Sequence, residues 1–66
     1  MMNFEEVVLG VVTKTLGSVP AKFTCGSLFV ECSIPEAITL ETELISKMKC
    51  GIIISRVGSE TAYDFV

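Results

Sequence analysis

Residues 3–17 read NFEEVVLGVVTKTLG, and the choice between helix and strand for this stretch decides the fold. A helical face that starts at position 4 predicts apolar residues at 4, 7, 8, 11, 12, 15 and 16, and Thr15 is the one exception. Asn3 followed by Glu6 is typical of a helix N-cap, and Gly17 is typical of a C-terminal stop. We therefore predict a helix over residues 4–16.

The composition of the same stretch also supports an alternative. Its four valines and two threonines are β-branched, which favours a strand, and Gly10 costs a helix interior about 1 kcal/mol relative to alanine. In the alternative, residues 6–14 form an edge strand, and the sheet packs on a single helix.

Residues 21–32 predict a β-hairpin, because two β-compatible runs flank Gly26-Ser27. Glycine at the first central position is typical of a type II′ turn, which pairs Phe23 with Val30 and Lys22 with Glu31. One face then carries Ala21, Phe23, Cys25, Leu28, Val30 and Cys32, and the other carries Lys22, Thr24, Phe29 and Glu31. Cys25 and Cys32 would lie about 13 Å apart along the ladder, beyond disulfide reach.

A second helix and a second hairpin follow. Ser33 and Glu36 resemble a capping box with Pro35 in the first turn, although the helix could instead begin at Thr39, and Gly51 is the expected stop near Cys50. Residues 52–57 and 60–65 then flank Gly58-Ser59, and a type II′ turn there pairs Ile54 with Tyr63 and Ile52 with Phe65.

The predicted fold is a single small α+β domain over residues 1–66, in the order helix, hairpin, helix, hairpin. The hairpins join into a four-stranded antiparallel sheet with both helices on one face, and the two halves repeat in architecture rather than in residue identity. Under the helices we expect to find buried Phe4, Val7, Val8, Val11, Val12, Leu16, Leu44, Ile45 and Met48. The opposite face exposes a candidate protein interface of Phe29, Ile53, Val57 and Ala62.

Composition indicates why a partner is expected. The chain has 66 residues, half of them apolar, with a mean hydropathy of +0.64. A domain this small buries only about 60% of the surface of its unfolded chain, so some apolar surface remains for a partner. A net charge of -3 argues against nucleic-acid binding. The one local concentration of basic residues is Lys47, Lys49 and Arg56, which could contact an acidic group or form ion pairs with neighbouring glutamates.

The sequence lacks the residues that metal binding and common catalytic mechanisms require. The sequence has no histidine, and Cys25, Cys32 and Cys50 show no Cys-x-x-Cys spacing, so we expect no metal, no cofactor and no enzymatic activity. Cys50 has no histidine to activate its thiol. No apolar run approaches the roughly 20 residues of a membrane span, and the acidic residues near the N-terminus lead us to expect no secretion signal. Free thiols suit a reducing compartment, so we expect a cytoplasmic protein.

These observations favour a non-enzymatic protein-protein interaction module. Small inhibitors or modulators from phages and mobile elements are often built in this way, and the link to them is an analogy at the level of size and composition. One alternative is a structural or assembly subunit that associates with copies of itself, for example as a homodimer. A lower-ranked alternative is a weak nucleic-acid binder that uses Lys47, Lys49 and Arg56.

Overall fold

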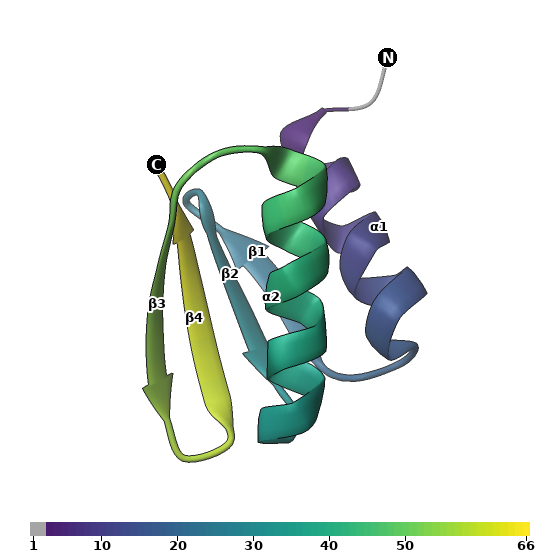
Figure 1. Cartoon of the computed structure of the whole chain (residues 1–66), viewed down its shortest axis with the longest axis vertical. Coiled ribbons are helices and arrows are strands. Elements are labelled where there is room, and N and C mark those ends of the chain that lie inside the picture. Colours follow the sequence, from purple (N-terminus) through teal and green to yellow (C-terminus); the bar gives the residue numbers. More distant parts are fainter. Residues whose placement is uncertain (1–2) are drawn as a thin grey trace.

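The computed structural model describes residues 3–66 and contains a helix followed by two strands, twice over. The elements are α1 (Phe4–Leu16), β1 (Ala21–Thr24), β2 (Ser27–Glu31), α2 (Ile34–Met48), β3 (Ile52–Val57) and β4 (Glu60–Phe65). The strands form one antiparallel sheet in the order β1-β2-β4-β3, and both helices lie on the same side of it (Figure 1). The predicted α+β fold is confirmed, and the alternative strand over residues 6–14 is wrong. Met1 and Met2 of the predicted domain lie outside the described residues.

The topology contains an internal twofold relation. Exchanging the first half of the chain for the second maps α1 onto α2, β1 onto β3 and β2 onto β4. The strand order β1-β2-β4-β3 is unchanged by this exchange, and β2 and β4 are antiparallel, so the relating axis passes between these two central strands. The outer strands β1 and β3 are therefore topologically equivalent edges.

Side-chain caps define both helix starts. The Glu6 N–H donates to Asn3 Oδ1 at 2.8 Å ahead of α1. Ser33 and Glu36 form a complete capping box ahead of α2, with the Ser33 N–H donating to Glu36 Oε1 at 3.0 Å. Such caps satisfy backbone donors that a first helical turn leaves free. The start at Ser33 is confirmed, and the alternative start at Thr39 is wrong.

The two helices end in different ways. Gly17 follows α1 with φ of 75°, as expected of a C-terminal glycine. The expected stop of α2 at Gly51 is wrong, because α2 ends at Met48 and Lys49 adopts the left-handed conformation with φ of 55°. Gly51 instead allows Val66 to lie close to the backbone, since a Cβ at position 51 would lie 2.8 Å from Val66 Cγ2.

The register of the first hairpin differs from the prediction. Its turn is Cys25-Gly26 rather than Gly26-Ser27, and both residues have positive φ, 54° and 80°, as a type I′ turn requires. Phe23 therefore pairs with Leu28 rather than Val30, and Lys22 pairs with Phe29 rather than Glu31. The shift of two positions keeps the strand residues on their predicted faces, but Cys25 leaves the core face for an exposed turn.

The second hairpin has the predicted register. Ile54 lies opposite Tyr63 and Ile52 opposite Phe65. Gly58 supplies the positive φ of 63° at the first turn position. This pairing places Tyr63, which is fully buried, in the core beneath α2.

The core lies between the helices and one face of the sheet. Its buried members are Val8, Val11, Val12, Leu28, Val30, Leu40, Leu44 and Tyr63. Two expected core residues are exposed instead, Phe4 at 45% and Ile45 at 56%. Phe4 lies in the first turn of α1 and packs its ring against Phe65, with ring centroids 5.2 Å apart. Ile45 lies one position past the buried stripe of α2, Ala37, Leu40 and Leu44. Val7, Leu16 and Met48 are half-buried.

Candidate protein-binding face

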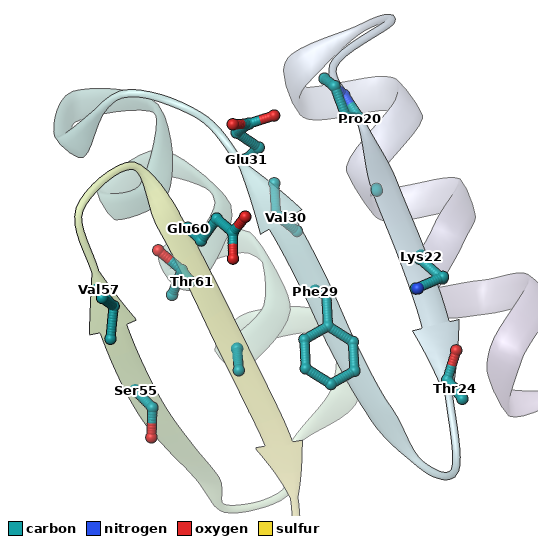
Figure 2. Close-up of a pocket in the computed structure, with 12 residues that line it drawn as sticks. Pro20, Lys22, Thr24, Phe29, Val30, Glu31, Ser55, Val57, Glu60 and Thr61 are labelled. Carbon is teal, nitrogen blue, oxygen red and sulfur yellow. The ribbon is translucent and has the colours of Figure 1, made fainter.

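The sheet face opposite the helices carries no covering element among residues 3–66. Alternation along the strands directs Lys22, Phe29, Ala62 and Ser55 to this face, and the register aligns them in one row across all four strands. Figure 2 views this face, with the helices behind the sheet and Phe29 near the middle. We call this surface the open face.

A hollow of about 770 Å³ lies on the open face. Phe29, Val57 and Ala62 are among its lining residues, and Phe29 is 44% exposed while Val57 is 81% exposed. Ile53 is 56% exposed and points to the same face, because it pairs with Asp64 on β4, but it does not line the hollow. Three of the four predicted interface residues therefore share one depression, and the fourth lies beside it.

Carboxylates gather at one end of this hollow. Glu31 and Glu60 are direct cross-strand partners on the open face, and both are exposed (Figure 2). Like charges in directly opposite positions destabilise a sheet. Among residues 3–66 the salt bridge found is between Arg56 and Glu41, so neither Glu31 nor Glu60 has a basic partner there. The hollow therefore has Phe29 and Ala62 in its middle and two carboxylates at one end, and Lys22, opposite Phe29, is the basic residue among its lining residues.

A polar network on the helical face of the sheet, the face covered by α1 and α2, holds the Arg56 side chain in place. Its guanidinium forms an ion pair with Glu41 of α2, and its Nε donates to Thr61 Oγ1 at 3.2 Å. The Tyr63 hydroxyl donates to Glu41 Oε2 at 2.9 Å. Burial, together with the bond to Glu41, raises the pKa of Tyr63 well above its usual value. The sequence carries no local signal for the bond between Tyr63 and Glu41, because these residues are 22 positions apart.

The three basic residues singled out in the sequence have different surroundings. Lys47 lines a small hollow with Val7, Gly10, Val11 and Lys14, along the α1–α2 side of the molecule. Lys49 caps α2, and Arg56 is held by Glu41. The ion pair with a glutamate that the sequence offered for Arg56 is present, and the structure does not bring the guanidinium and Lys47 to the same hollow.

The three cysteines differ in exposure, and the sequence has no histidine to activate any of their thiols. Cys25 is exposed in the first turn, whereas Cys32 and Cys50 are half-buried, and all three are free. Burial, with a smaller contribution from the nearby Glu36 carboxylate, raises the pKa of the Cys32 thiol and so reduces its thiolate fraction. Within residues 3–66 we find no cluster of three or more His, Cys, Asp or Glu side chains that could hold a metal ion.

Neither helix in the described part of the chain has both the length and the apolar character needed to cross a membrane. Searches against protein-family models, curated proteins and solved structures found no match to this chain.

Proposed function

We propose that this protein is a non-enzymatic binding module that acts as a small inhibitor or modulator by holding a helix of another protein on its open face. The observation that carries the proposal is Phe29, a large aromatic side chain in the middle of a hollow and 44% exposed. Buried aromatic anchors contribute a large share of the binding free energy at protein interfaces. The open face is therefore better suited to binding another protein than to binding a small substrate.

The chemistry of the hollow defines the partner helix. A sheet face that becomes covered packs on helices or on a second sheet, and the rear face of this sheet already packs on helices (Figure 1). An apolar stripe of the partner would cover Phe29 and Ala62, and a lysine or arginine beside that stripe would lie between Glu31 and Glu60. The basic group would relieve the repulsion between these carboxylates, which supports a basic amphipathic helix as the ligand.

We also propose that the protein acts in the cytoplasm. Its three free cysteines support a compartment that keeps thiols reduced. An inhibitor or modulator in that compartment would act by occupying a basic helix that its target needs for another contact.

A pair of matched variants tests the proposal. Phe29→Lys places a charge in the hollow, and Ile38→Lys places the same charge on α2, where Ile38 is 55% exposed on the helical side. Immobilised wild type and Ile38→Lys should retain the same protein from a lysate of the cells that make this chain, and Phe29→Lys should lose it. Circular dichroism should show that both variants stay folded. Retention of that protein by folded Phe29→Lys would disprove the proposal.

A second variant tests the acidic end of the hollow. Glu60→Lys should weaken binding of the same partner by tenfold or more, because it presents a cation to the basic residue of the helix. Raising the ionic strength should weaken the wild-type complex as well, since exposed charge pairs are screened by salt. Salt-independent binding that tolerates Glu60→Lys would remove the basic helix from the proposal.

A further inference from the structure

The outer edge of β3 has a row of free backbone groups. The Val66 N–H donates to the Gly51 carbonyl at 3.0 Å, which makes these two residues a hydrogen-bonded pair of the β3–β4 ladder. Such pairs alternate with non-hydrogen-bonded pairs in an antiparallel ladder, so Ile53 and Ser55 also bond to β4. The backbone groups of Ile52, Ile54 and Arg56 therefore point to the opposite side, where no strand lies among residues 3–66.

Strand β3 is also exposed on both of its faces. Ile53 on the open face is 56% exposed, and Ile54 on the helical face is 41% exposed. Proteins usually protect an edge strand with a proline, a bulge, a free charge or a covering element. The register runs unbroken from Ile52 to Val57 without proline, and its one charged residue, Arg56, is occupied by Glu41.

The sequence of this edge is self-complementary. Antiparallel pairing along the free edge must place outward-bonding residues opposite one another, as Ile52 and Ile54 are. A twofold axis at Ile53 places each Ile52 opposite Ile54 of the second copy, and Ile53 opposite its own equivalent. Gly51 then lies opposite Ser55, so every isoleucine of the run meets another isoleucine.

We infer that β3 pairs antiparallel with β3 of a second copy of this chain, in the register centred on Ile53. The two sheets join into one, with all helices on one side and both open faces on the other. This contact goes beyond the proposed function, because it uses the strand edge and leaves the Phe29 hollow of each copy free. A different extended peptide would satisfy the same backbone groups, but the isoleucine pairing specifically favours a second copy.

Proline variants at the two edges test which strand makes the contact. Ile54→Pro removes an outward N–H and keeps the β3–β4 bonds of its neighbours. Ala21→Pro is the matched control, because the Ala21 N–H points to the free side of β1 by the same alternation, as the bond from Glu31 N–H to the Pro20 carbonyl at 3.1 Å shows. Light scattering over a micromolar to millimolar series should show that wild type and Ala21→Pro dimerise, whereas Ile54→Pro stays monomeric.

Engineered disulfides test the register. The native thiols are first removed by Cys25→Ser, Cys32→Ala and Cys50→Ser. In the proposed register, the Cα atoms of residue 53 in the two copies should lie about 4.5 Å apart, within the roughly 4.4 to 6.8 Å that a disulfide spans. Mild oxidation of Ile53→Cys should therefore give a covalent dimer. Ser55→Cys is the control on the same face, because its two copies would lie about 13 Å apart along the strands and should stay reduced.

Three outcomes would overturn the inference. Wild type that stays monomeric up to millimolar concentration rejects the contact, and a dimer that survives in folded Ile54→Pro moves it away from β3. Equal oxidation of Ile53→Cys and Ser55→Cys rejects the register. Phe29→Lys should still dimerise, so that failure of the proposed function and failure of this contact are distinguishable.

Discussion

The two edges of the sheet occupy equivalent places in the topology but are built in opposite ways. Strand β1 has four residues, follows Pro20, lies against α1 and contributes Phe23 to an aromatic cluster with Phe4 and Phe65. Strand β3 has six residues and exposes isoleucine on both faces. The difference shows that strand order alone does not protect an edge, because the placement of a helix and the local sequence decide which edge stays available.

The largest expected difference between the edges is in stability. Phe23→Ala should lower the free energy of unfolding by about 2 to 3 kcal/mol, because it removes a half-buried ring that packs against the core. Ile53→Ala should change it by less than about 0.5 kcal/mol in dilute solution, where an exposed side chain makes few contacts. Urea denaturation measures both values. Equal losses at the two positions would contradict the contrast between the edges.

A smaller effect is expected where β3 is tied to α2. Glu41→Ala should cost about 2 kcal/mol of stability, because it leaves the buried Tyr63 hydroxyl and the Arg56 guanidinium without their acceptor. Glu41→Gln keeps an acceptor oxygen and should cost less than about 1 kcal/mol. Urea denaturation of the two variants separates the acceptor from the charge, and a larger loss in Glu41→Gln would show that the charge dominates.

Alkaline pH should lower the stability of the fold, because the buried hydroxyl of Tyr63 on β4 resists ionisation. Its pKa is raised in the folded state, chiefly by burial, whereas an unfolded tyrosine titrates near about 10. The unfolded state therefore releases the proton first, so the contribution of Tyr63 is complete below about pH 10 and is lost as the pH rises above it. Thermal unfolding from pH 8 to 11.5 should show a steeper loss in wild type than in Tyr63→Phe, which has no tyrosine left. Identical slopes would contradict this assignment.

The smallest expected effect concerns thiol reactivity. Cys25, exposed in the turn that follows β1, should react readily with iodoacetamide at neutral pH, because the reagent can reach its thiol. Cys32 is half-buried with a raised thiol pKa, and it should react several-fold more slowly. Mass spectrometry of the labelled peptides over time gives both rates. Fast labelling of Cys32 would indicate that the β2 side opens more readily than β1.

Local patterns in the sequence were sufficient for much of the fold. The period of residues 4–16, the cap at Asn3 and the capping box at Ser33 each depend on neighbours three or four positions away, and all three predictions are confirmed. The predicted register of the second hairpin is also confirmed. Gly58 is the single residue in its turn with positive φ, as the predicted type II′ turn requires.

The errors have a common physical origin. In the first hairpin, Gly26 suits either a type II′ or a type I′ turn, and the choice depends on whether Cys25 accepts the left-handed conformation. In α2, periodicity placed Ile45 inside, but burial depends on which strands the helix covers. The ion pair of Arg56 with Glu41 and the bond of Tyr63 to the same carboxylate require knowledge of that packing. The candidate interface residues lie on the predicted face, but the pairing of Glu31 with Glu60 became visible only in the structure.

The internal twofold has a consequence for the connection between the halves. Each half contributes one helix and one hairpin, and the halves join through β2 against β4 and α1 against α2. A cut between Cys32 and Ser33 would leave two fragments, each too small to bury a core by itself. Together they would recover the same seam, including the bond from the Cys32 N–H to the Ser59 carbonyl at 3.0 Å. We therefore expect the two fragments, mixed together, to reassemble as a split protein through these contacts.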